Sequence, residues 1–432
     1  MTRSALLLPL LVGLVVGDAG AQSVPEGSQA SDLAPWLRRT PSFRIDPFRH
    51  VMIPRWGFAI SVGGSAENNA LNLEDVGALM LLDDDDKIGY GDAIDVLGLV
   101  PRGRGIAASG LAESGAYMGG RLFGGLSIGF SAQGRAYGAF LLDDDAAALL
   151  RDGNGARQDF TLGDSRGAAL ASLDYGLHAV LRLGPVYSLD GPIVVLGAGG
   201  RLVRPVFYGR GRSTIANGGT IRVTGDSIVA NVAIESHYTN YDDFTVSDAL
   251  GSRGSGVAAD FLVRLEWPTN GFALEAMVAN IGKVTVEDLE HRTGAINVST
   301  TILDSVIGIL DTFDLTVVGT ETLDVTLPRI VRFRASAWAN RILQIDLFTT
   351  LPAGGDFPTV IAVDIGTTWR FVKALPLRFG LVVGGHQGVG FTGGFAIEGQ
   401  SGFLRFMGQS LGGLFGSATG ASGRLEFGAF FF

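Results

Sequence analysis

Residues 169–183 read ALASLDYGLHAVLRL, and this stretch decides the fold. Its odd-numbered positions are all apolar, whereas its even-numbered positions include Ser172, Asp174, His178 and Arg182. A period of two is typical of a β-strand with one apolar and one polar face. The stretch is longer than an average soluble strand of about five or six residues, and it is long enough to cross a bilayer at a tilt.

The same alternation recurs along the chain. It is clearest in residues 257–267, 331–337, 343–347, 361–371 and 375–383. Weaker patterns predict further strands near residues 56–64, 116–133, 133–142, 193–204, 220–235, 272–281 and 389–398. We therefore predict an all-β fold, a single transmembrane antiparallel up-and-down β-barrel of about 14 strands, with a range of roughly 12 to 16.

Composition agrees with a membrane barrel. The 432 residues include 64 Gly and no Cys, only 18% are charged, and the mean hydropathy is +0.31. The net charge of -10 leaves no cation surplus for nucleic acid, and the lack of Cys excludes disulfides. After the N-terminal segment no apolar run is long enough for a spanning helix, so a closed barrel is the remaining way to satisfy backbone hydrogen bonds in lipid.

The N-terminus predicts export. Arg3 precedes an apolar run at residues 5–17, and Ala19 and Ala21 offer a cleavage site, so residues 1–21 are expected to be a cleaved signal peptide. Residues 22–55 are then a periplasmic lead-in, and residues 56–432 form the barrel in the bacterial outer membrane. Two interruptions, residues 71–100 and 301–313, are expected to be short helical plug or loop segments.

The polar strand faces supply the candidate site. The residues expected to line the lumen are Asp174, His178, Arg182, Asp260, Arg264, Glu266, Arg332, Arg334, Asp346, Asp364, Arg370 and Arg378. Acids and bases nearly balance on these faces, which predicts low ion selectivity. Two interpretations stay open: the charges hold the barrel together, or they line a passage for small or amphiphilic solutes.

Other chemistry is not favoured. Ser172 and His178 are six residues apart on one strand, roughly 20 Å at ~3.3 Å per residue, too far for a hydrolytic triad with Asp174. The acidic run at residues 83–86 lacks the Gly and Glu of a calcium loop. Gly103, Gly105 and Gly110, like Gly197, Gly199 and Gly200, are not followed by the Lys-Ser/Thr pair of a phosphate-binding loop. The five His lie far apart in sequence, so no metal site, no cofactor and no enzymatic activity are predicted.

The chain ends in a strand that closes on Phe432, which resembles the C-terminal signature that the outer-membrane assembly machinery recognises. Leu425, Phe427, Ala429 and Phe431 form its apolar face, and Phe432 falls in line with Glu426.

Residues 303–313, LDSVIGILDTF, precede a Thr326-Leu327-Pro328 opening of the next strand, RIVRFRASAW. This order of features resembles FadL-like outer-membrane barrels, a superfamily of long-chain fatty-acid transporters with TraF-like and PorV-like members. It is most similar to an uncharacterised group within that superfamily. The Asn-Pro-Ala motif of true fatty-acid transporters is missing near the mature N-terminus.

The resemblance implies a passive conduit or binding protein for small hydrophobic or amphiphilic molecules. Residues 71–100 or 301–313 would then be the plug or gate. The PorV likeness implies the alternative, a non-transporting structural barrel or a component associated with a secretion system. In either case the lipid bilayer is the main partner.

Overall fold

The computed structural model describes residues 47–48, 51, 56–70, 72, 105–152, 159–161, 163, 165–184, 191–214, 219–224, 227–240, 251–267, 271–301, 315–338, 343–353, 362–372, 374–385, 388–399, 401–413 and 418–431. They form one 18-stranded sheet and one helix, α5 (Asp144–Asp152). The described part of the chain holds no helix long and apolar enough to span a membrane. The expected signal peptide and the expected insertions at 71–100 and 301–313 lie outside the described residues, apart from Asn72 and Thr301.

The strands are β1 (Gly57–Asn68), β2 (Ile106–Phe123), β3 (Leu126–Leu142), β4 (Asp159–Thr161), β5 (Arg166–Leu183), β6 (Ile193–Ser213), β7 (Thr220–Thr224), β8 (Ser227–Thr239), β9 (Gly254–Trp267), β10 (Phe272–Thr301), β11 (Thr316–Thr326), β12 (Arg329–Trp338), β13 (Leu343–Ala353), β14 (Ala362–Val372), β15 (Leu375–Gly384), β16 (Gly388–Glu398), β17 (Gly402–Leu411) and β18 (Gly420–Phe430).

Fourteen of these strands form a closed ring. β1 pairs with β2 along one edge and with β18 along the other. The ring continues through the pairs β2–β3, β3–β5, β5–β6, β6–β9, β9–β10 and β10–β12, and then through each consecutive pair from β12 to β18. All of these pairings are antiparallel. The predicted all-β antiparallel barrel is thus confirmed, with the expected number of strands in the ring.

The remaining four strands build on one side of the ring. β8 occupies the same place between β6 and β10 as β9 does, but farther along both strands. β11 likewise continues the line of β12 along the other edge of β10, while β7 pairs with β8 and β4 with β7. We call β4, β7, β8, β11 and the paired parts of β6 (209–213) and β10 (289–301) the extension.

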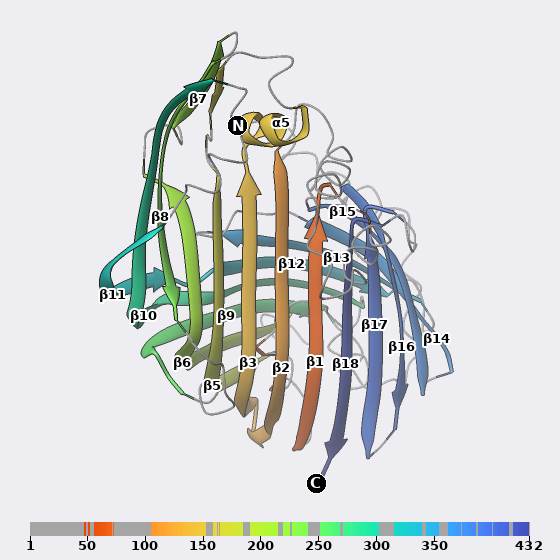
Figure 1. Cartoon of the computed structure of the whole chain (residues 1–432). Helices are drawn as coiled ribbons and strands as arrows, with labels where there is room; N and C mark the ends of the chain where they lie inside the picture. Colours follow the sequence, from red (N-terminus) through yellow and green to blue (C-terminus); the bar gives the residue numbers. More distant parts are fainter. Residues whose placement is uncertain are drawn as a thin grey trace, which may run out of the picture.

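The two ends of the barrel differ. The C-terminus and the two-residue turn between β2 and β3 lie at one end, and α5 and the extension lie at the other (Figure 1). Short turns face the periplasm in barrels of the bacterial outer membrane. In a barrel of that kind the extension would lie at the external end, and we use the terms external and periplasmic for the two ends in this sense.

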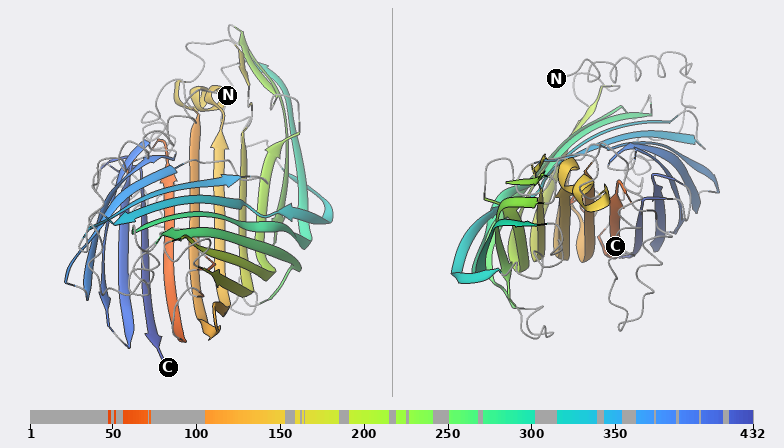
Figure 2. Two further views of the ribbon diagram at one scale, coloured as in Figure 1. Left: turned by 180° about the vertical axis from the view of Figure 1, so that it is seen from behind. Right: turned by 45° about the horizontal axis from the view of Figure 1, so that its top comes forward.

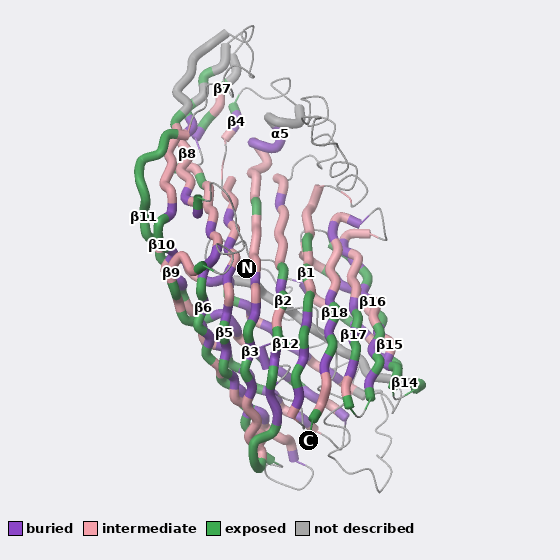
Figure 3. Tube along the Cα trace, turned by 60° about the horizontal axis from the view of Figure 1, so that its bottom comes forward, coloured by how far each residue is buried: buried purple, intermediate pink, exposed green. Residues whose placement is uncertain are grey.

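Burial alternates along the strands (Figure 3). Ile60, Phe261 and Phe427 are among the apolar side chains that are more than half exposed on the outer surface, whereas Asp174 and Asp260 are buried inside. Apolar side chains outside and charges inside reverse the arrangement of a soluble protein and match a barrel surrounded by lipid.

The apolar outer band stops short of the extension. On β9 the exposed large apolar side chains end at Val257, and on β10 they end at Ile281. Among residues 282–295 of β10 no large apolar side chain is exposed. In the described part of the extension the exposed large apolar side chains are Val229 of β8 and Val317 and Val318 of β11. The continuous apolar band of the ring therefore ends below the extension.

The barrel is flattened, and its walls touch inside. The strands of the back wall, β9, β10, β12 and β13, run across those of the front wall (Figure 2). Tyr137 of β3 and Asn280 of β10 are hydrogen-bonded across the interior, with 3.2 Å between Oη and Nδ2. Side chains from opposite walls thus fill this part of the barrel.

Three expected boundaries were wrong. The strands predicted at 116–133 and 133–142 are instead β2 and β3, which meet at Gly124 and Gly125 rather than at Gln133. Gly124 has φ +50°, a conformation that Gly adopts without steric cost. The turn contains no Pro or Asn that would have marked it in the sequence. The strand predicted at 220–235 is the hairpin of β7 and β8.

Candidate functional site

A row of paired charges crosses the inner wall. Its members are Arg424 (β18), Glu113 (β2), Arg135 (β3), Asp174 (β5), Arg201 (β6) and Asp260 (β9), which we term the charge belt; all are buried. Because alternate residues of each strand face inward, six strands each contribute one charge at a similar height. Three cations and three anions alternate along the belt, so its formal charge is zero.

The ion pairs run without a break along the belt. Arg424 Nη2 lies 3.2 Å from Glu113 Oε1, and Arg135 Nε lies 3.6 Å from the other oxygen of the same carboxylate. Arg135 Nη1 donates to Asp174 Oδ2 at 3.0 Å. Arg201 then bridges Asp174 and Asp260, donating from Nε to Asp260 Oδ2 at 2.8 Å. Each charge of the belt thus has a counter-charge, as burial in a low dielectric requires.

Asp260 makes several hydrogen bonds besides those to Arg201. Its carboxylate lies 2.9 Å from His178 Nε2 and accepts a hydrogen bond of 2.9 Å from the backbone N–H of Asn280. Asn280 has φ +63° at a bulge of β10, and its side chain bonds Tyr137, Arg201 and the carbonyl of Pro328. The bulge therefore connects the belt on the front wall to β10 and to the start of β12.

Further charge clusters lie on the inner wall away from the belt. Glu266 pairs with Arg182 at 3.3 Å and with Arg264 at 2.9 Å, and Arg264 also reaches Glu275 at 3.0 Å. Glu275 in turn lies 2.8 Å from Arg332. Across the barrel, Arg378 pairs with Asp364 at 3.1 Å, and Arg405 lies between Glu398 and Glu426 at 3.1 and 3.5 Å.

The belt separates two apolar zones. On the external side lies the upper apolar cluster: Ala168, Leu170, Val203, Tyr208, Ala258, Val284, Val286, Leu289, Val325 and Leu327. On the periplasmic side lies the lower apolar cluster: Phe48, Val51, Val180, Val195, Leu262, Met277, Ala279 and Ile330. Along β6 the order Val195, Arg201, Val203 shows the zoning directly. Beyond the lower cluster the wall is charged again, at Arg264 and Glu266 of β9 and at Glu275 of β10. From that end outward the inner wall is thus charged, apolar, charged at the belt, and apolar.

The end of the expected lead-in lies inside the barrel. Phe48 is fully buried, and its ring packs edge-on against His178 with 5.4 Å between centroids. The backbone N–H of Val51 donates to the carbonyl of Phe48 at 3.1 Å, forming a turn. A Cβ on Gly197 would lie 2.9 Å from Phe48, so the glycine makes room for this ring.

The structure places the residues expected in the lumen as follows. Asp174, His178, Asp260, Arg264, Glu266, Arg332, Arg334 and Arg378 are buried on the inner wall, and Arg182 and Asp364 are there with side chains partly exposed. Asp346 and Arg370 belong to β13 and β14, but their side chains lie outside the described part. His178 contacts Asp260 rather than Ser172, and Ser172 donates to Asp174 at 2.8 Å, so these three residues do not form a triad.

Several members of the network were missed from the sequence. Glu113 and Arg135 lie on strands whose boundaries were wrong, and Arg201 follows a Gly-rich run that hides the alternation. Glu275 alternates with Ala273 and Met277 on a face that looks apolar in sequence. These residues could have been found by looking for opposite charges on neighbouring strands. That search requires the pairing register of the strands, which the sequence alone does not provide.

The extension carries a separate group of charges. Glu290 accepts hydrogen bonds from Tyr238 Oη at 2.8 Å, from Asn240 Nδ2 at 2.7 Å and from Arg292, and these bonds, with that from Arg292 the largest, hold the pKa of Glu290 below its usual value. Burial lowers the pKa of His237, and the hydrogen bond from His237 lowers the pKa of Glu321.

Comparison with known proteins finds no matching family model and no similar curated protein. In structure the chain is similar to the Ralstonia pickettii toluene transporter TbuX, with 9% identity, a TM-score of 0.46, and 90% of this chain and 93% of that chain covered. It is also similar to the P. putida toluene transporter TodX, with 9% identity, a TM-score of 0.45 and the same coverages. A Pseudomonas aeruginosa FadL homologue matches with 11% identity, a TM-score of 0.43, and 89% and 92% covered.

Proposed function

We propose that the chain is an outer-membrane barrel that binds a small hydrophobic or amphiphilic molecule on the inner wall at its external end. The observation that carries the proposal is the upper apolar cluster, which lies directly above the charge belt. A binding site for such a molecule needs apolar walls and a few convergent polar groups. The cluster supplies the walls, and the belt supplies charged groups for a polar head.

Passage through the barrel would be gated. The belt and the lower apolar cluster with Phe48 lie between the upper cluster and the periplasmic end. A solute that crosses must separate buried ion pairs and displace Phe48. The similarity to toluene transporters is in keeping with an apolar cargo.

Dye binding tests the proposal. The purified full chain in detergent is titrated with the apolar fluorescent dye N-phenylnaphthylamine. Val286→Asn places an amide within the upper cluster, and burying an unpaired polar group costs about 1–3 kcal/mol, so we expect dye affinity to fall roughly tenfold. Val317→Asn, at an exposed position of β11, is the matched control and leaves affinity unchanged. Equal affinity in both variants, with the barrel folded, would refute the site.

A second candidate is a non-transporting structural barrel, favoured by the unbroken ion pairing of the belt. A solute-free interior of this kind would bind no dye and would release no dye or ions from liposomes. Dye binding that Val286→Asn weakens excludes this alternative. Release of solute from liposomes in addition would assign transport.

A further inference from the structure

One cluster of metal-ligand side chains lies in the extension, on the face of the sheet that carries Leu289 of the upper apolar cluster. His237 of β8 and His291 of β10 are directly opposite in the antiparallel pairing. Their rings stack with 4.3 Å between centroids and 10° between planes. Glu321 of β11, on the other edge of β10, pairs opposite Leu289, two residues from His291, so all three side chains share one face of the sheet.

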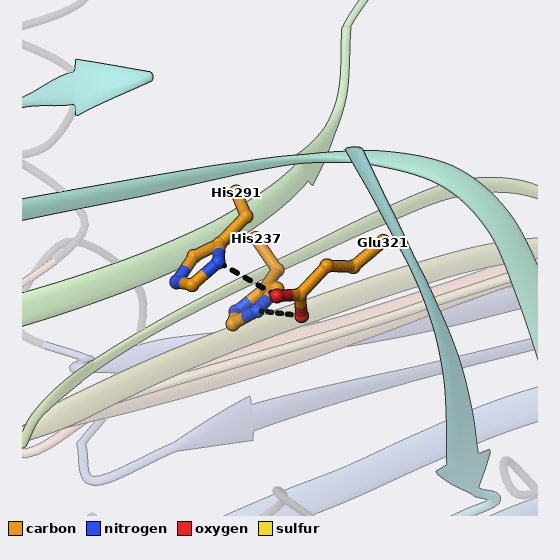
Figure 4. A group of neighbouring side chains, drawn as sticks. All are labelled: His237, His291 and Glu321. Carbon is orange, nitrogen blue, oxygen red and sulfur yellow. Dashed lines mark hydrogen bonds and ion pairs between the residues drawn. The ribbon is translucent and has the colours of Figure 1, made fainter. Parts of the chain in front are cut away.

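Both rings turn an edge toward the carboxylate (Figure 4). His237 Nε2 lies 3.1 Å from Glu321 Oε2, and His291 Nδ1 lies 2.9 Å from Glu321 Oε1. One donor atom from each residue lies within 4.8 Å of the others. Two imidazoles and one carboxylate form a ligand set that Zn²⁺ uses in proteins, with water in the fourth place.

We propose that His237, His291 and Glu321 bind a divalent transition-metal ion of the Zn²⁺ class. The ion would link three adjacent strands, β8, β10 and β11, and fasten both edges of β10 in the extension.

The surroundings of His291 support a ligand. Its side chain is 15% exposed. Nδ1 faces the Glu321 carboxylate, whereas Nε2 is buried without a hydrogen-bond partner among the described residues. Unpaired buried polar atoms are rare in native structures and point to an ion or ligand. Gly319 lies opposite His291, and a Cβ there would meet nothing within 4 Å, which leaves room beside the ring.

Binding requires a small closure of the side chains. Bonds of about 2.0–2.1 Å at a tetrahedral ion place donor atoms roughly 3.3 Å apart, closer than the widest spacing here. Glu321, 45% exposed, is the ligand most able to move inward. Arg210 lies 3.5 Å from His237 Nδ1, and it shares the carboxylate of Glu235 with Arg212, at 3.5 and 2.6 Å respectively, so this positive charge opposes a cation and the Glu321 carboxylate must offset it.

Direct metal titration tests the site. The full chain in detergent is stripped with a chelator and titrated with Zn²⁺ against a chromophoric competitor, and Co²⁺ serves as a spectroscopic probe. We expect one high-affinity ion per chain and a Co²⁺ visible spectrum of tetrahedral type. His291→Asn and Glu321→Gln should each weaken Zn²⁺ at least tenfold.

Asp324→Asn is the matched control, because Asp324 lies on the same strand and bonds Thr285 at 2.7 Å rather than the histidines. It should leave Zn²⁺ affinity unchanged. Circular dichroism and the migration of unheated samples on gels establish that each variant is folded. No high-affinity ion in the wild type, or equal loss in Asp324→Asn and Glu321→Gln, would overturn the proposal.

Discussion

Replacing Asp260 with Asn tests whether the charge belt stabilises the barrel. The carboxylate is fully buried and faces Arg201 Nε at 2.8 Å, Arg201 Nη2 at 3.1 Å, His178 and the backbone N–H of Asn280. Asn retains one acceptor oxygen, but it turns an NH₂ toward these groups and leaves Arg201 without half of its counter-charge. Breaking a buried pair by removing one partner costs about 3–5 kcal/mol.

The lower end of that range applies, since Asp174 still contacts Arg201. A loss of about 3 kcal/mol corresponds to roughly a 150-fold shift in the unfolding equilibrium. The assay is urea unfolding in lipid vesicles, followed by tryptophan fluorescence. Asp159→Asn is the matched control, because Asp159 also pairs with an arginine, Arg222, but both side chains are largely exposed.

The control should leave the free energy of unfolding unchanged within error, because exposed ion pairs contribute little. If Asp260→Asn is no more destabilising than Asp159→Asn, the belt does not stabilise the barrel and the reasoning fails.

Three further outcomes are expected. Val263→Arg places a charge in the apolar outer band and should destabilise the barrel in vesicles by about 2 kcal/mol. Val317→Arg, in the extension, should leave the free energy of unfolding unchanged. Equal effects of the two substitutions would contradict the position assigned to the membrane-spanning band. The hydrogen-bond partners of Glu290 lower its pKa in the folded protein, so the stabilisation that they give is complete above about pH 4.5 and is lost as the pH falls through this lowered pKa. Amide hydrogen exchange in β8 should therefore become faster at these low pH values. Glu290→Gln should abolish this pH dependence. Gly197→Val should expel Phe48 and expose the chain near it to limited proteolysis, and unchanged cleavage would argue against its packing.

The fold was predictable because lipid outside and a closed interior impose alternation on every strand. Residues 169–183 fall within β5, with Leu177 and Leu181 outward and Asp174 and His178 inward. Boundaries failed where glycine occurs in both strands and turns. Gly124 and Gly125 make the turn after β2, yet Gly119, Gly120 and Gly129 lie within strands, so the residue type alone does not distinguish them.

The interior was predictable as a set of inward charges but not as a network. Alternation along one strand places Asp174 and Asp260 on the polar face, whereas their shared partner Arg201 follows only from the register between β5, β6 and β9. The pairing of His237 with His291 was missed for the same reason, because it depends on β8 and β10 lying side by side. That Asp174, Asp260 and the other inward charges line a lumen stays a prediction.

The meeting of β1 with β18 has a consequence for biogenesis. Gly57 pairs with Phe430, so the hydrogen bonds that seal the ring join its first strand along the chain to its last. A nascent chain that lacks β18 has two unpaired edges, each able to recruit a foreign strand. Sealing therefore has to wait until β18 has been made, and until then the chain needs protection from aggregation.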